Sequence, residues 1–244
     1  MKNFEFQPLL LLFMVTLAIT KHPNGSHTLR YVFTLLSWPG HPEPELIFLS
    51  YVDETQIMGF NSVSESQRME SRVPWMSDLS AEFWELATED ILKEHRFLNT
   101  IMRKLLKIYN DSMNGYHTIQ ETYGCQVKER LSFSHAFMEL VLDTHDYITL
   151  NEDLQTWRGV GKAAEIIKEE WEKINLAKIS KSFLLGACVE GLLGYLDFGK
   201  THLLRIDPPE STIPFMAMII SLVLGALLLG AMMAFLIWKR RTRG

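Results

Sequence analysis

Residues 117–127 of this chain have the sequence His-Thr-Ile-Gln-Glu-Thr-Tyr-Gly-Cys-Gln-Val, which predicts a strand. Successive side chains of a strand point to opposite faces. One face of this strand therefore carries Ile119, Glu121, Tyr123 and Cys125. Cys188 is the one other cysteine and lies in an expected helical stretch. A disulfide between Cys125 and Cys188 would hold that helix over this face; two free, buried thiols are the alternative.

Outward from this strand, a series of strands followed by helices occurs twice. The expected strands are 27–36, 45–52, 55–60, 117–127, 131–142 and 145–150, and the expected helical stretches run from Pro74 to about Tyr109 and over 162–175 and 178–204. The first strand has its own same-face set, formed by Leu29, Tyr31, Phe33 and Leu35. This order predicts an α+β fold with two long helices on one face of an antiparallel sheet.

The C-terminal region contains an apolar segment. Residues 215–238 include no charged side chain, and 24 residues of helix extend about 36 Å, enough to cross a ~30 Å hydrocarbon core. Lys239, Arg240, Arg241 and Arg243 follow at once, which places the C-terminus in the cytoplasm. We therefore expect a single-pass, type I protein of the plasma membrane with an extracellular ectodomain.

The N-terminal 24 residues have the pattern of a signal peptide. Lys2 precedes the apolar run 9–15, and small or polar residues follow at Ala18 and Thr20. An uncleaved anchor is the alternative. The secretory route is oxidising, so pairing of the two cysteines is the default expectation. Asn110-Asp111-Ser112 is an acceptor sequence for N-glycosylation, and we expect a glycan on Asn110.

Composition and motifs exclude several classes of function. The formal net charge is −5, which disfavours binding to nucleic acid. The chain has no His-Glu-x-x-His motif, nucleophile elbow or phosphate-binding loop, so we expect no enzyme and no cofactor. The histidines, among them His95, His117 and His135, lack paired metal-ligand spacing. We expect no metal site.

Several motifs carry a specific resemblance. They are GSHTLRY at 25–31, YVDETQ at 51–56, QRMESRVPWM at 67–76, HTIQ at 117–120, YGC at 123–125, DYI at 146–148 and LNEDLQTW at 150–157. In this order they resemble the first two domains of class I major histocompatibility (MHC) heavy chains, of the divergent, class Ib-like kind. The resemblance implies the α1/α2 platform, an eight-stranded antiparallel sheet under two helices. It also implies the Cys125–Cys188 disulfide of the second domain, and it places Asn110 where the family carries its glycan.

The resemblance divides the chain into six expected parts. They are a signal peptide (1–24), an α1-like domain (25–114), an α2-like domain (115–205), a tether (206–214), a transmembrane helix (215–238) and a cytoplasmic tail (239–244). Family heavy chains continue into an immunoglobulin-like α3 domain, which we expect to be missing because the tether leads directly to the apolar segment. A skipped exon and a true two-domain gene are both compatible with this layout.

The resemblance also assigns the groove. Tyr31 and Tyr195 match the family's groove tyrosines, whereas Phe83 and Phe183 lack a hydroxyl that the family has, and Gly191 replaces a tryptophan. Tyr123 is a further expected groove residue. At the other end, Ile108, Ile167 and Glu170 replace the tyrosine, threonine and lysine that hold a peptide carboxylate, and Trp171 is retained. Glu170 would repel a carboxylate. We expect a groove that does not capture free peptide termini and is either closed or filled by a hydrophobic ligand.

Three functions follow as hypotheses. The first is immune recognition at the cell surface, in which a ligand or the helices themselves are displayed to a T-cell or killer-cell receptor. The others are a closed-groove ligand for a killer-cell-type receptor and an escort for another membrane protein. The set Thr34, Tyr51, Gln56, Gln120 and Asp146 resembles the underside contacts of beta-2-microglobulin, although ordinary strand residues retained by descent explain it equally well. Without an α3 domain, this partnership would be weakened.

Overall fold

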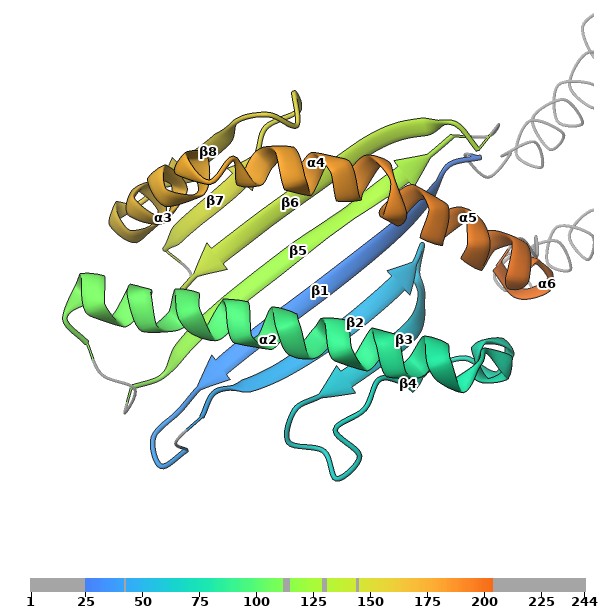
Figure 1. The fold of residues 1–244 in the computed structure, drawn as a ribbon, viewed down its shortest axis with the longest axis horizontal. Helices are drawn as coiled ribbons and strands as arrows, with labels where there is room; N and C mark the ends of the chain where they lie inside the picture. The colour runs from blue at the N-terminus through green and yellow to red at the C-terminus, as the bar shows by residue number, and fades with distance from the viewer. Residues whose placement is uncertain (1–24, 42, 112–114, 129–130, 144, 204–244) are drawn as a thin grey trace, which may run out of the picture. The chain divides into compact units, whose positions relative to one another are not determined.

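An eight-stranded antiparallel sheet forms the base of the molecule (Figure 1). The computed structural model describes residues 25–203 except 42, 112–114, 129–130 and 144. The strands are β1 (His27–Ser37), β2 (Glu45–Val52), β3 (Thr55–Asn61), β4 (Glu70–Ser71), β5 (His117–Val127), β6 (Phe133–Leu142), β7 (Asp146–Leu150) and β8 (Trp157–Val160). Their order in the sheet is β4-β3-β2-β1-β5-β6-β7-β8, so the first strands of the two halves pair at the centre, with Tyr31 opposite Tyr123.

The helices lie on one face of this sheet (Figure 1). The first half contributes a 3-10 helix, η1 (Pro74–Asp78), and α2 (Ala81–Tyr109); the second half contributes α3 (Lys162–Lys173), α4 (Leu176–Leu185), α5 (Ala187–Phe198) and α6 (Lys200–Leu203). The Ser80 side chain accepts a hydrogen bond from the backbone N–H of Phe83 and so caps the start of α2. The predicted fold class, α+β with two helical stretches on one face of the sheet, is confirmed.

The second helical stretch is more broken than the sequence predicted. We expected one helix over 178–204, but Gly186 has φ −103° and ψ −97° and separates α4 from α5. Asn175, in the left-handed region with φ 53°, separates α3 from α4. The six predicted strands are correct to within two residues, but β4 and β8 were missed because two and four residues are too few to show an alternating pattern.

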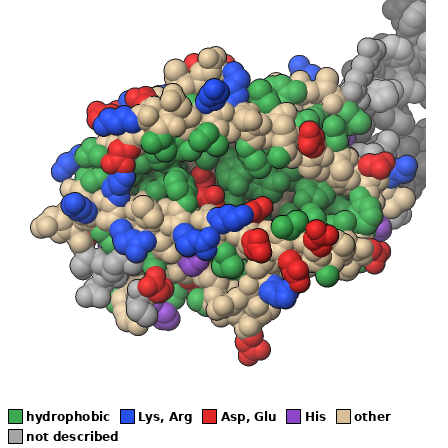
Figure 2. Space-filling model, viewed as in Figure 1, with side chains coloured by type: hydrophobic (Ala, Val, Ile, Leu, Met, Phe, Trp, Pro, Cys, Tyr) green, Lys and Arg blue, Asp and Glu red, His purple; other side chains and the backbone are tan. Residues whose placement is uncertain are grey.

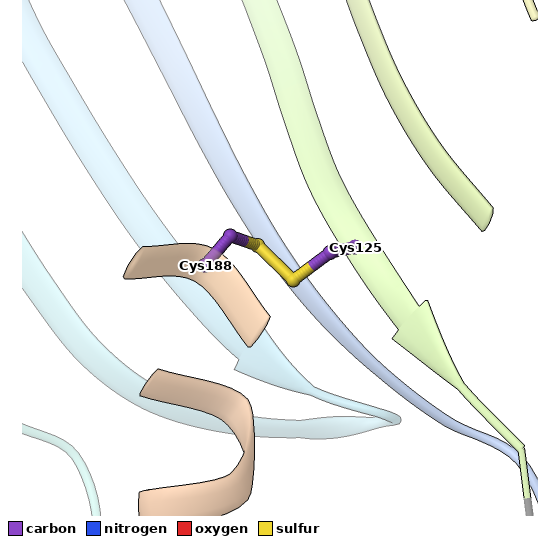
Figure 3. The surroundings of a disulfide bond; sticks show 2 residues. All are labelled: Cys125 and Cys188. Carbon is purple, nitrogen blue, oxygen red and sulfur yellow. A yellow bond between two sulfur atoms is a disulfide. The ribbon is translucent and has the colours of Figure 1, made fainter. Parts of the chain in front are cut away.

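The Cys125–Cys188 disulfide joins the floor to α5, with an S–S length of 2.04 Å and Cα atoms 6.1 Å apart (Figure 3). Both cysteines are fully buried, as are Leu29 and Leu192. The bond closes a 63-residue separation, which in the chain-entropy model stabilises the fold by about 4 kcal/mol. The predicted disulfide, and the face predicted for Cys125, are confirmed.

Among the described residues, one stretch, Leu176–Phe198, is long and apolar enough to cross a membrane. In this chain it forms α4 and α5, whose Leu184, Cys188 and Leu192 are buried against the sheet, so it is part of the platform. The expected signal peptide, tether, transmembrane helix and tail lie outside the described residues.

Candidate ligand-binding groove

The floor between the helices is aromatic at its centre. The rings of Tyr31 on β1 and Tyr123 on β5 have centroids 5.2 Å apart. Phe183 on α4 packs on both of them, at 6.4 Å from Tyr31 and 5.6 Å from Tyr123. Figure 2 shows a hollow between the two helical walls, lined largely by hydrophobic side chains. Strand alternation places these rings on the face that the helices cover, as the sequence predicted.

The end of the groove beneath α5 is built from tyrosines and a glycine. Burial raises the pKa of Tyr195 to about 12, and it also raises the pKa of Tyr31, so both hydroxyls stay neutral. A Cβ atom at Gly191 would lie 3.7 Å from Leu29 and 4.0 Å from the Tyr31 hydroxyl, both ordinary contacts. Gly191 therefore leaves space beside Tyr31. Phe83, in the first turn of α2, packs edge-on against Trp84 at 5.1 Å.

At the opposite end, α2 and α3 bridge the groove. Lys104 on α2 donates to the carboxylate of Glu170 on α3. The rings of Phe97 and Trp171 stack across the groove with centroids 6.3 Å apart, and Trp171 also packs on Trp157 of β8. Ile167 is 1% exposed, and the backbone oxygen of Ile108 accepts a hydrogen bond from Lys162 of α3. This end is held together by direct contacts between the helices.

The ion pair changes the expectation for Glu170. The sequence suggested an unpaired anion that repels a carboxylate, but Lys104 neutralises it. Lys104 and Glu170 are 66 residues apart, so the pairing could not be read from local spacing. The sequence did contain a signal for the α2 side of this contact. Successive members of a set on α2 are three, seven and four residues apart, which places them on one face of the helix: Glu94, Phe97, Lys104 and Ile108.

A pair of acidic residues lies between strand β5 of the sheet and the face of α2 that carries Phe97 and Lys104. Glu121 of β5 is 1% exposed and lies on the face that also carries Tyr123. Its carboxyl interacts with that of Glu94 on α2, and the buried Oε2 atom of Glu121 and Oε1 atom of Glu94 have no hydrogen-bond partner among the described residues. Burial raises the pKa of Glu121 well above its usual value, and the charge of Glu94 raises it further. Burial also raises the pKa of Glu94, so both carboxyls keep a proton to a higher pH than exposed glutamates do.

The sequence predicts that Glu121 lies on the face of the sheet that the helices cover, but it indicates no function for this residue. An acidic residue in a set of apolar floor positions is a signal of function or of an internal partner. Glu94 was missed altogether, because nothing in the sequence indicates that α2 brings it to the floor strand.

The family comparison agrees with this geometry. The family model described as "Class I Histocompatibility antigen, domains alpha 1 and 2" matches residues 25–203. The chain belongs to this class I family. It is 43% identical over 203 residues to the mouse (Mus musculus) "H-2 class I histocompatibility antigen, Q10 alpha chain", which covers 83% of this chain and 62% of the relative.

Two further relatives give a similar picture. The rat (Rattus norvegicus) "Class I histocompatibility antigen, Non-RT1.A alpha-1 chain" is 43% identical over 83% of this chain and 64% of its own length. The mouse "H-2 class I histocompatibility antigen, K-D alpha chain" is 38% identical over 85% of this chain and 56% of its own length. The chain therefore spans less than two thirds of the length of these curated relatives.

One residue assigned to the underside of the class I sheet has an internal role instead. Asp146 is buried, and its carboxylate accepts hydrogen bonds from the backbone N–H groups of Ala163 (2.6 Å) and Ala164 (3.2 Å) and from the Tyr109 hydroxyl (2.9 Å). It anchors the N-terminus of α3. These internal bonds favour the alternative that Asp146 is an ordinary strand residue retained by descent, and its contact with beta-2-microglobulin stays a prediction.

The other four underside candidates remain exposed or half-buried. They are Thr34, Tyr51, Gln56 and Gln120. Thr34 and Gln120 face each other across the β1–β5 pair, and Thr34 alternates with the core residues Phe33 and Leu35. They are available on the side of the sheet opposite the helices.

The remaining predicted residues have structural surroundings. Asn110, the residue after the last turn of α2, is exposed and has φ 53°. His117 is buried with its Nδ1 atom 2.8 Å from the carboxylate of Asp143, and His95 contacts the backbone oxygen of Pro44. Within the part of the chain that the structure describes, no group of three or more His, Cys, Asp or Glu residues is arranged to hold a metal ion.

Proposed function

We propose that this chain is a class I-like glycoprotein of immune recognition at the cell surface, which displays a groove ligand or its own helices to a T-cell or killer-cell receptor. One observation carries the proposal: the α1/α2 platform is present with both helical walls, the Cys125–Cys188 bond and a side-chain-lined hollow between the walls. The relatives are named as histocompatibility antigens, which agrees with such a role. The role is one of binding, not catalysis.

The groove does not favour conventional capture of peptide termini. Phe83 and Phe183 lack hydroxyls at the Tyr31 end, and each missing hydrogen bond weakens binding by about 0.5–1.5 kcal/mol. At the other end, the Lys104–Glu170 pair and the Phe97–Trp171 stack occupy the space between the helices. A shorter ligand, bound in the central part of the groove, fits this arrangement better than an extended peptide held at both ends.

The same bridge supports a second candidate function. If α2 and α3 stay joined and the centre collapses, the upper faces of the helices become the recognised surface, as in a closed-groove ligand of a killer-cell-type receptor. Exposed apolar side chains on the second helical stretch, Ile174 and Ile179, provide contact area for such a receptor.

We infer a weakened partnership with beta-2-microglobulin. The underside of the sheet still presents Thr34, Tyr51, Gln56 and Gln120, whereas Asp146 binds the N-terminus of α3.

Membrane topology belongs to the same proposal. The apolar segment 215–238 and the basic residues after it predict a type I protein, and the exposed position of Asn110 is compatible with a glycan in the extracellular part.

The test is expression of the full-length chain in mammalian cells with a C-terminal tag. We expect a glycosidase-sensitive protein at the cell surface, a tag that antibodies reach only after permeabilisation, and activation of reporter cells that carry T-cell or killer-cell receptors. A protein retained inside the cell, or one that activates no receptor but raises the surface level of a second membrane protein, would contradict display and favour the escort hypothesis.

A further inference from the structure

Glu94 and Glu121 form a buried acidic pair in the groove. Among the described residues, neither carboxyl has a basic partner. Among them, no ion pair includes either carboxyl. Glu94 Oε1 and Glu121 Oε2 are buried, and neither has a hydrogen-bond partner among the described residues. Glu121 is 1% exposed and lies on the floor face, directed toward the helices.

Three other acidic residues of the platform have hydrogen-bond donors or a basic partner. Asp146, also buried, accepts three hydrogen bonds, and Asp143 accepts from the backbone N–H of Thr118 and contacts His117. Glu170, in the same groove, is paired with Lys104. A buried charge without a donor or a cation is costly, so proteins rarely keep one without a use. Glu94 and Glu121 are therefore the groove residues with unused capacity for a cation.

The surroundings define the rest of the ligand. Tyr123, two residues from Glu121 on the same face, packs on Phe33 at 5.3 Å and on Phe183 at 5.6 Å. Figure 2 shows acidic side chains within the hydrophobic hollow, whereas most basic side chains lie on the rims and outer surface. Aromatic faces also attract a cation. A matching molecule has an apolar body and one positive group that reaches the floor.

We propose that the centre of the groove binds an apolar ligand through a single ammonium or guanidinium group, which the carboxyls of Glu94 and Glu121 accept. The inference rests on the proposed display function and specifies its ligand chemistry. The charged anchor lies in the middle of the groove, so the ligand needs no free carboxylate or α-amino group at its ends. A long-chain amine and a peptide with a central basic side chain share this chemistry.

The test uses the full-length chain, purified from mammalian cells, with 4-phenylbutylamine and the uncharged 4-phenylbutan-1-ol as a matched pair of probes. We expect the amine to bind about 10- to 100-fold more tightly than the alcohol, the range for a charge-assisted hydrogen bond. In Glu121→Gln and Glu94→Gln this preference should fall to less than threefold. The control Glu89→Gln, at an exposed position of the same helix, should keep it.

A second arm distinguishes the two sources of the ligand. Nonamer peptides with blocked termini and either lysine or norleucine at the central position are compared in the same assay. Tighter binding of the lysine peptide identifies a peptide ligand, and preference for the amine probe alone identifies a small amphipathic amine.

Equal binding of each charged probe and its neutral partner to the wild-type chain would overturn the inference. That result would leave the proposed function intact if the protein still reached the cell surface and activated receptors. Intact Cys125–Cys188 bonds in every variant, shown by peptide mapping, would exclude misfolding as the cause of lost binding.

Discussion

At the scale of single residues, two buried acids have opposite effects on the fold. Asp146 contributes stability because its carboxylate satisfies two backbone N–H groups at the start of α3 and the Tyr109 hydroxyl. Glu121 belongs to the proposed cation site and lowers the stability of the fold. It is buried among apolar side chains of the sheet without a basic partner among the described residues. The sequence could place both on strands, but their partners on α2 and α3 depend on tertiary packing.

Glu121 predicts an unusual pH dependence. The folded state holds its proton above the ordinary carboxyl pKa, so between the unfolded and the raised folded pKa the native protein binds more protons than the unfolded chain. The contribution of Glu121 to the free energy of unfolding is therefore fully present below about pH 4.5. It falls as the pH rises, by at most about 1.4 kcal/mol per pH unit.

The measurement is denaturant unfolding of the wild-type protein and Glu121→Gln between pH 4.5 and 7.5. The free-energy difference between them should shift in favour of the glutamine variant with rising pH. A pH-independent difference would show that Glu121 titrates normally in the folded protein. Glu94 and Tyr123, whose pKa values burial also raises, are titratable groups that interact with Glu121.

Asp146 gives the second prediction. Replacing it in Asp146→Ala leaves the N–H groups of Ala163 and Ala164 without an acceptor, which should reduce the free energy of unfolding by about 1–3 kcal/mol. Asp197→Ala, at an exposed position of α5, serves as the control and should change it by less than about 0.5 kcal/mol. An equal effect of the two variants in chemical denaturation would contradict the anchoring role.

At the scale of elements, the contacts between α2 and α3 decide the shape of the groove. Strand positions were predictable because alternating side chains mark a sheet with one covered face, as in Leu29, Phe33 and Leu35. The break at Asn175 lies at the end of the expected stretch 162–175, whereas the break at Gly186 was not predicted, because a helical pattern continues through it. Pairs such as Lys104 with Glu170 lie far apart in the chain and follow from packing alone.

A double-mutant cycle tests the bridge between these helices. Lys104 and Glu170 are partly exposed, so their coupling energy should be about 0.2–1 kcal/mol. The exchanged variant, Lys104→Glu with Glu170→Lys, should regain most of the stability that either single change loses. Additive losses measured in chemical denaturation, without recovery in the exchanged variant, would mean that the pair does not link α2 to α3.

The bridge also affects any attempt to restore a peptide-carboxylate clamp. From the sequence, Ile108→Tyr, Ile167→Thr and Glu170→Lys together should raise peptide binding. In the structure, the new lysine at 170 would face Lys104, and the new threonine at 167 would place a hydroxyl in a site that is 1% exposed. We therefore expect the triple variant to gain peptide binding only when Lys104→Ala is added, as measured by thermal stabilisation with a nonamer library.

At the scale of the whole molecule, the platform is preserved, and we propose that the means of holding a ligand has changed. The disulfide, the strand order and the helical walls follow the class I family to which the chain belongs. In this proposal, apolar side chains, the bridge between α2 and α3 and the Glu94–Glu121 pair stand in place of clamps for the peptide termini. We therefore propose that this groove does not capture peptides by their free termini.

The most direct test is mass spectrometry of material extracted by acid and organic solvent from the full-length protein, purified from the surface of mammalian cells. We expect no length-restricted set of peptides of eight to ten residues at near one-to-one occupancy. We also expect apolar molecules that carry one basic group to be enriched in the wild-type extract relative to that of Glu121→Gln. A length-restricted peptide set at near one-to-one occupancy, unchanged in Glu121→Gln, would contradict this proposal and restore conventional presentation.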